Sequence, residues 1–310
     1  MATLLDFRRR IRSVKGTQQI TRAMKFVAAA RLRRAQEKVV AARPYARRML
    51  DVLHSAISRV ENPSHPLMAR RPEERVLLLV VSGERGLCGA FNSNVIRKTL
   101  EFLREHRQQT LAVIAIGKKG RDALRKRKWS LAAGYINVTT RVEFSQAKEI
   151  AARVIAPYAA GEVDAVYAVY NEFKTVLAQK LTLRKLLPIE LAPLEAGAAE
   201  HAPQQAPSHA AASPGAPPPP TEAYPVDYIY EQPAAEIFGG LLPRYVETQV
   251  FAAMLESSAA EHAARMTAMD SATNNAAELI EHLTLHMNKV RQAAITKEIL
   301  EVVSGAAWTA

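Results

Sequence analysis

The chain has 310 residues, of which 48% are hydrophobic and only 6% aromatic, a balance that favours long helices packed through small side chains over an all-β sandwich. Its net charge of +12 resides in residues 1–60, which hold 15 Lys/Arg and three Asp/Glu, whereas 27 basic and 27 acidic residues cancel in the remainder. The single cysteine, Cys88, excludes an intramolecular disulfide and a cysteine zinc cluster, and no apolar run approaches the ~20 residues of a membrane-spanning helix.

The first predicted element is a long helix over residues 1–62. Steps of three and four residues from Leu4 to Val60 give 17 positions, 14 of them apolar, which is the seam of a coiled coil. The three polar seam positions are consecutive: Gln18, Thr21 and Lys25. Polar groups on a seam fix the register or mark a change of partner.

The middle of the chain, residues 73–190, is predicted to form a separate Rossmann-like α/β domain. Continuous apolar runs such as 75–82 are typical of buried parallel strands. Strands are predicted at 75–82, 111–117, 163–170 and 175–187, and helices at 93–107 and 145–160, with a basic helix leading toward 132–138. A turn is predicted at Asn171 and Glu172. This alternation predicts a doubly wound sheet with an antiparallel pair at its edge.

Residues 191–222 contain ten Ala and eight Pro, a composition that cannot bury a core, and we predict a flexible insertion there. Residues 223–234 are expected to return the chain to the body through a short strand. A second long helix is predicted over 235–306, because no Pro or Gly occurs between Pro243 and Gly305. About 60 helical residues span roughly 90 Å, so this helix needs a partner, and an antiparallel coiled coil with the first helix is expected.

The sequence predicts no catalytic, cofactor-binding or metal-binding residue. The glycine-rich loop 82–92 lies between a strand and a helix, where phosphate-binding loops occur, but its glycines match neither GxGxxG nor GxxxxGK[ST]. A tight turn is therefore preferred to a nucleotide site. His282 and His286 have the spacing of a metal pair without the Glu of HExxH, so a solvated helix face is expected for them and for His262.

Charge alone leaves two partners open for the basic N-terminal helix, a nucleic acid or an acidic protein surface. Residues 1–60 contain only two aromatic residues, Phe7 and Tyr45, which serve base stacking poorly. A nucleotide-dependent enzyme that uses the central domain is a third possibility.

Three stretches resemble the gamma subunits of the rotary F-type ATP synthase, in the family's order: 17–31, 85–92, and 261–275 continuing to 288–305. The resemblance covers nearly the whole chain except 191–222. It implies a non-catalytic rotor shaft that turns inside a hexamer of alpha and beta subunits and couples proton flow to ATP synthesis or hydrolysis on beta. It also implies contacts with the epsilon subunit and the ring of c subunits, one copy per complex, no nucleic acid, and indirect membrane association.

By the same resemblance, Met24 and Lys25 match the family's position for contact with beta and for coupling. Arg291, Gln292 and Thr296 match the C-terminal segment that touches beta, and the polar seam positions are expected to face it. The family motif begins close to Met1, which favours the cytoplasmic face of a bacterial inner membrane. The cysteine-free insertion lies where plastid relatives carry paired cysteines, so thiol control is not available to it.

Overall fold

The computed structural model describes residues 3–60, 64–107, 109–190 and 233–309. The predicted insertion at 191–222 and the short strand expected before residue 231 lie outside the described residues. The described chain divides into two units, a smaller one of residues 1–33, 87–89 and 262–310, and a larger one of residues 34–86 and 90–261. Each unit is described by itself.

The larger unit contains a five-stranded sheet with the strand order β3-β2-β1-β4-β5. Strands β1 to β4 are parallel, and β5 pairs antiparallel with β4 at the edge. The prediction of a doubly wound sheet with an antiparallel edge pair is thus confirmed. The strands are β1 (Arg75–Val81), β2 (Thr110–Ile116), β3 (Leu131–Tyr135), β4 (Ala165–Phe173) and β5 (Gln179–Leu187).

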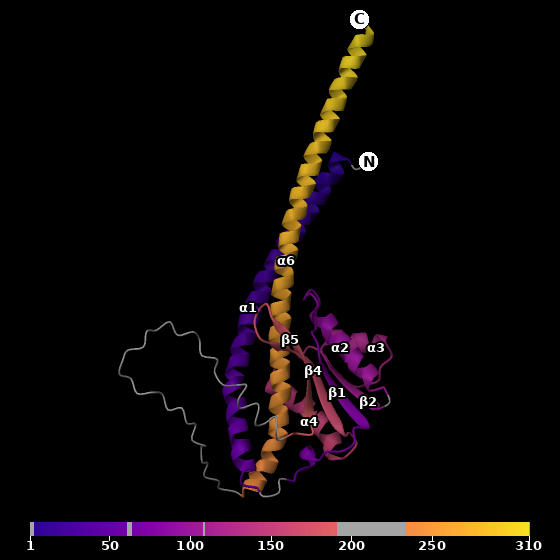
Figure 1. Ribbon diagram of the computed structural model, residues 1–310. Helices are drawn as coiled ribbons and strands as arrows, with labels where there is room; N and C mark the ends of the chain where they lie inside the picture. Colours follow the sequence, from indigo (N-terminus) through magenta and orange to yellow (C-terminus); the bar gives the residue numbers. More distant parts are fainter. Residues whose placement is uncertain (1–2, 61–63, 108, 191–232, 310) are drawn as a thin grey trace, which may run out of the picture. The chain divides into compact units, whose positions relative to one another are not determined.

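Helices cover both faces of this sheet (Figure 1). Helices α2 (Phe91–Glu105) and α3 (Lys118–Lys126) pack on the face that carries Leu78 and Val80. Helix α4 (Phe144–Ala159) packs on the opposite face, near Leu77. Because both faces are covered, both sets of alternating side chains in β1 are buried, which explains its uninterrupted apolar run.

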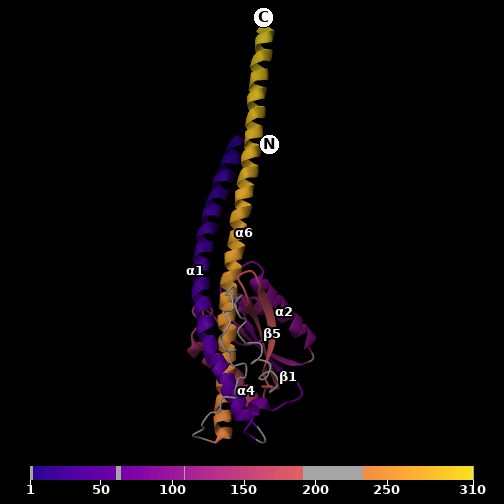
Figure 2. The ribbon, with the colours of Figure 1, turned by 60° about the vertical axis from the view of Figure 1, so that its left-hand side comes forward.

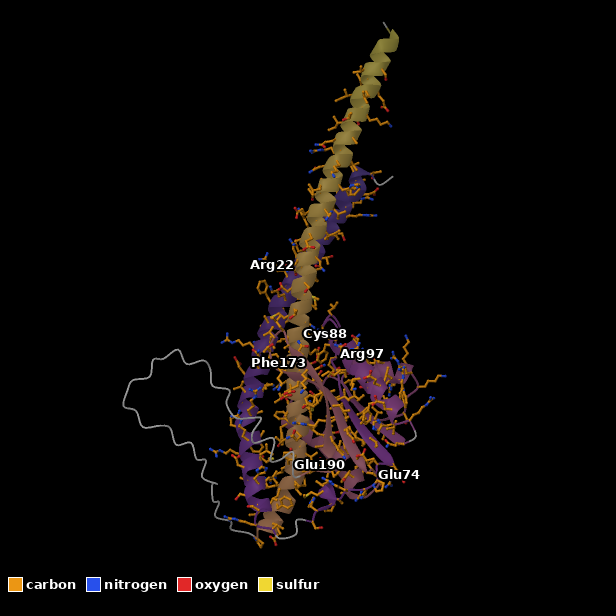
Figure 3. The ribbon with its side chains drawn as sticks, viewed as in Figure 1. Arg22, Glu74, Cys88, Arg97, Phe173 and Glu190 are labelled. Carbon is orange, nitrogen blue, oxygen red and sulfur yellow. The ribbon has the colours of Figure 1, made fainter. Side chains whose placement is uncertain are left out.

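The turn predicted at Asn171 and Glu172 is wrong. Both residues belong to β4, where they pair with Leu181 and Lys180 of β5, and the chain reverses only after Phe173. The amide of Ala178 donates to the Thr175 hydroxyl and closes this turn. Polar side chains suggested a turn, but the backbone ladder continues through both residues, and the side chain of Asn171 is buried. Figure 3 shows Phe173 at one end of the sheet and Glu74 and Glu190 at the other.

The two terminal helices are α1 (Leu4–Ile57) and α6 (Ala234–Thr309), and a short 3₁₀ turn, η1 (Pro66–Met68), follows α1. In the larger unit, α6 is buried around its whole circumference near residues 253–261. The Thr248 hydroxyl contacts the sulfur of Met49 on α1, and the Ser258 hydroxyl donates to the carbonyl of Thr139. This part of α6 therefore packs on both α1 and the sheet domain, and its contacts extend beyond a single coiled-coil seam.

Candidate functional site: the paired helices and their exposed surfaces

In the smaller unit, α1 and α6 pair antiparallel. The rings of Phe7 and His286 meet edge to face with 5.0 Å between their centroids. Farther along, the hydroxyls of Thr21 and Thr273 are 2.8 Å apart. Residue numbers thus rise on α1 as they fall on α6, and both views show the two helices side by side (Figures 1 and 2).

The predicted seam of α1 faces its partner. Every seam position from Leu4 to Val60 is buried or half-buried, and Ala28 and Leu32 are only 1% and 3% exposed. On α6, Met269 and Ala276 are buried on the matching stripe. Small residues on the seam allow the close approach that the alanine-rich composition indicated.

The polar seam positions find polar partners on α6. Lys25 Nζ lies 2.6 Å from Asp270 Oδ1, with both side chains partly exposed at 37% and 47%. The Thr21 hydroxyl also lies 3.0 Å from the carbonyl of Gln18, and that of Thr273 lies 2.7 Å from the carbonyl of Met269. Because Thr21 and Lys25 each meet a polar side chain of α6, these two positions fix the register of the pair at a modest cost in stability.

The expectation that this break faces the segment with Arg291 and Thr296 is wrong. Lys25 lies opposite Asp270, and 21 residues of helix, about 30 Å, separate Asp270 from Arg291. The two groups of predicted contact residues are therefore not brought together. Helix α6 continues past the Phe7–His286 contact, while α1 begins at Leu4.

The structure places the predicted contact residues on two separate surfaces. Lys25 on the seam and Met24 beside it are half-buried, whereas Arg291, Gln292 and Thr296 are exposed on the final part of α6. Large apolar side chains are exposed on the same final part, which is typical of an interaction surface. These side chains are Ile295, Ile299, Leu300, Val302 and Val303.

A second exposed apolar group on α1 was missed by the sequence reasoning. Ile20 and Phe26 are each 62% exposed, and Val27 is 53% exposed. They flank Arg22, which is labelled in Figure 3. The sequence contains a signal for this group, because all three are apolar residues at positions outside the seam. The heptad pattern was assessed only at seam positions.

The solvated face predicted for the histidines is wrong for His262, which is buried in the smaller unit. Nδ1 of His262 lies 3.3 Å from Nη1 of Arg265, itself buried. Burial, followed by the charges of Arg265 and Arg31, lowers the pKa of His262 to about 4. The absence of a metal-binding motif led to the expectation of a solvated face, but His262 is only 8% exposed.

His282 and His286 are both exposed, as predicted, and the ring of His286 contacts that of Phe7. No group of three or more His, Cys, Asp or Glu residues suited to a metal ion occurs within the described part of the chain.

In the larger unit, the part of the glycine-rich loop that belongs to it turns its polar groups inward. The Gly83 amide donates to Asn92 Oδ1 at 2.9 Å, and a Cβ at Gly83 would come within 2.8 Å of the Glu261 carboxyl carbon. Two backbone amides at the start of α3 also have hydrogen-bond acceptors within the protein. The amide of Lys118 donates to Glu84 Oε2, and the amide of Gly120 donates to the Ser82 hydroxyl. Because these amides are already bonded within the protein, the arrangement favours the interpretation of the loop as a tight turn and not as a phosphate-binding site.

Comparisons with known proteins agree on one family. A family model described as ATP synthase matches residues 3–307. A chain named ATP synthase gamma chain from Solibacter usitatus is 49% identical over 99% of both chains. One with the same name from Pelotomaculum thermopropionicum is 46% identical, again over 99% of both.

Solved structures share the fold. The chain resembles one from the rotor of the Euglena gracilis mitochondrial ATP synthase, with a TM-score of 0.59 and 21% identity over 94% of this chain and 98% of that one. It also resembles one from the central stalk and c ring of the Tetrahymena thermophila mitochondrial ATP synthase, with a TM-score of 0.56 and 23% identity over 82% of this chain and 99% of that one. Across the described residues, every helix is too short or too polar to cross a bilayer.

Proposed function

The chain belongs to the family of ATP synthase gamma chains, and from that premise we propose that it is the central rotor shaft of a proton-translocating ATP synthase. It is a non-catalytic subunit: ATP is made or hydrolysed on the beta subunits, and this chain couples that reaction to proton flow. The observation that carries the proposal is the antiparallel helix pair with matched polar residues on its seam. Such a pair resists sliding, as a torque-bearing shaft must.

The partners that follow are the hexamer of alpha and beta subunits, the epsilon subunit and the ring of c subunits, with one copy of this chain per complex. The chain is a peripheral component of the complex. We place it at the cytoplasmic face of a bacterial inner membrane, in keeping with its 46–49% identity to the chains of Solibacter usitatus and Pelotomaculum thermopropionicum.

Met24, Lys25, Arg291, Gln292 and Thr296 are proposed as contacts with beta. The exposure of the last three, among apolar side chains on the end of α6, supports a role in binding. Near Met24 and Lys25, the exposed Ile20, Phe26 and Val27 extend the surface that a surrounding subunit can bury. The excess of positive charge in residues 1–60 suits acidic loops on that partner.

Co-purification tests the proposal directly. A tagged copy of the chain should bring down alpha and beta subunits in an assembly that hydrolyses ATP, and a chain that never joins such a hexamer would refute the shaft function. The competing hypothesis of a nucleic-acid-binding protein has no support from the comparisons, which agree on the gamma-chain family.

The contact residues need a finer experiment. Replacing Arg291, Gln292 and Thr296 together by Ala should lower proton pumping per ATP hydrolysed in membrane vesicles. Lys289→Ala, an exposed residue of the same helix segment, is the control and should leave that ratio unchanged. Equal ratios in the triple variant and the wild type would exclude these three residues as coupling contacts.

A further inference from the structure

Positive charge is concentrated on one helix of the larger unit. Residues 118–128 contain seven Lys/Arg and a single acid, Asp122, which pairs with Arg121 at 2.8 Å. Outside residues 1–60 the chain as a whole is balanced, so this concentration is local. The six other basic residues are all exposed and are called the α3 cationic patch: Lys118, Lys119, Arg125, Lys126, Arg127 and Lys128.

The patch is not neutralised by the surrounding protein. Within the described residues, none of its six members forms an ion pair with an acid. The neighbouring helix α2 is different, because its basic residues alternate with Glu101 and Glu105, and Lys98 pairs with Glu101 at 3.1 Å. Six like charges on a short segment repel one another, and that repulsion lowers stability unless a partner relieves it.

The stability of α3 does not explain the whole patch. Arg125 and Lys126 lie in the last turn, where positive charge is favourable to the helix dipole. Lys118 and Lys119 lie in the first turn, where positive charge is unfavourable. A pair of cations kept at the unfavourable end indicates a use outside the fold.

The surface chemistry of α3 selects among anionic partners. No large apolar side chain of α3 is exposed, and Trp129, just beyond it, packs against the core. A permanent protein interface would need an apolar centre, and a site for single-stranded nucleic acid would need aromatic side chains for stacking. The headgroups of anionic lipids need only clustered Lys/Arg, and four to eight such residues suffice.

We propose that the α3 cationic patch contacts anionic phospholipid headgroups at the membrane surface. The inference rests on the proposed function in one respect, because a chain that binds the membrane-embedded ring of c subunits works close to the bilayer. It adds a direct electrostatic contact to the membrane association through partner subunits.

Flotation with vesicles tests this inference on the purified assembly of this chain with its alpha, beta and epsilon subunits. The wild-type assembly should float with vesicles that contain phosphatidylglycerol, and less so with phosphatidylcholine alone. Replacing Lys118, Lys119, Arg125 and Lys126 by Gln should weaken binding at least about tenfold and up to several hundredfold, since each cation near an anionic surface contributes up to about fivefold. Added salt should weaken wild-type binding by screening.

The matched control removes the same number of charges from the neighbouring helix and the turn that follows it. Replacing Arg97, Lys98, Arg104 and Arg107 by Gln should change vesicle binding by less than about threefold, because Glu101 and Glu105 lie between them and offset half of their charge. Figure 3 shows Arg97 projecting from α2. Both variants should keep their subunits and their ATP hydrolysis, which separates a failure of this inference from a failure of the rotor function.

Three outcomes would overturn the inference. The first is wild-type binding that does not depend on phosphatidylglycerol, or that the α3 variant retains in full. The second is loss of the epsilon subunit from the α3 variant, which would assign the patch to a protein partner. The third is binding of an RNA oligonucleotide that the α3 variant loses while its vesicle binding is unchanged, which would assign the patch to nucleic acid.

Discussion

Two ionisable side chains of α6 are held away from their ordinary pKa by burial, in opposite directions. In the smaller unit, burial and the charges of Arg265 and Arg31 lower the pKa of His262 from 6.5 to about 4. In the larger unit, burial, followed by the charge of Glu172, raises the pKa of Glu256 from 4.5 to about 7, and Arg184, Arg43 and Lys174 oppose the rise. Each group therefore makes stability depend on pH.

His262 should destabilise its surroundings on acidification. It is neutral when folded, and the unfolded chain binds the proton more readily, so stability is full above about pH 6.5 and falls as the pH drops toward 4. The full effect is about 3 kcal/mol. Hydrogen exchange of amides around residue 262 in the assembled complex should show this slope, and His262→Gln should remove it. A slope that survives in the variant would assign it to another group.

Glu256 should have the opposite effect. It binds its proton more tightly in the folded chain, so its contribution is present at pH 4.5 and lost as the pH rises through about 7. Glu256→Gln should therefore raise stability at pH 8 by about 1–2 kcal/mol, a value reduced for its partial exposure. Hydrogen exchange near residue 256 at pH 8 and pH 5 measures the change. A variant that is less stable at pH 8 would show that the charged form is favourable.

At the scale of elements, the join between β2 and α3 depends on Gly117. This residue has a φ of 95°, and a Cβ there would lie 2.1 Å from the carbonyl oxygen of Ser82. Gly117→Ala should cost more than about 2 kcal/mol, through strain and the forced shift of the backbone. Gly240, in α6, has nothing within 4 Å of the same position, so Gly240→Ala should gain up to about 1 kcal/mol.

Thermal unfolding of the assembled complex compares these two glycine variants. Equal effects would mean that the contact with Ser82 relaxes at little cost. The comparison is informative because both residues belong to the larger unit and both changes add one methyl group.

Periodicity predicted the helices and strands of this fold better than it predicted their contacts. The seam from Leu4 to Val60 was found because a 3.5-residue repeat is a property of one helix. The partner of Lys25 was not found, because the register of two helices depends on where both begin, and α6 runs past the end of α1. The burial of His262 was missed for a related reason, since no pattern within one helix reports what covers it.

The candidate site was only partly predictable. Met24 and Lys25 were found through the family resemblance, and the exposed Phe26 beside them was not. Outside that site, the raised pKa of Glu256 was not predicted, because its charged neighbours Glu172, Arg184 and Arg43 come from three different elements. Long-range juxtaposition of charges leaves no spacing to count in a single sequence.

At the scale of the whole molecule, the Ala/Pro-rich stretch should be dispensable for the core function. Its composition cannot bury a core, and it contains no cysteine for thiol control. We propose that it is an inert or sterically regulatory tether. Deleting residues 195–220 should leave co-purification with the hexamer and proton pumping per ATP unchanged, and loss of hexamer binding would rule out the inert version.

The matched pairs Thr21–Thr273 and Lys25–Asp270 also limit how the shaft can fail under load. If one helix shifted along the other by one heptad, Lys25 would lie opposite Ala263 or Ala277. Its ammonium group would then lose its counter-ion. Axial displacement by one heptad is thus penalised, whereas twisting the two helices together leaves each pair in place. The two matched pairs therefore favour a single axial register of the helix pair.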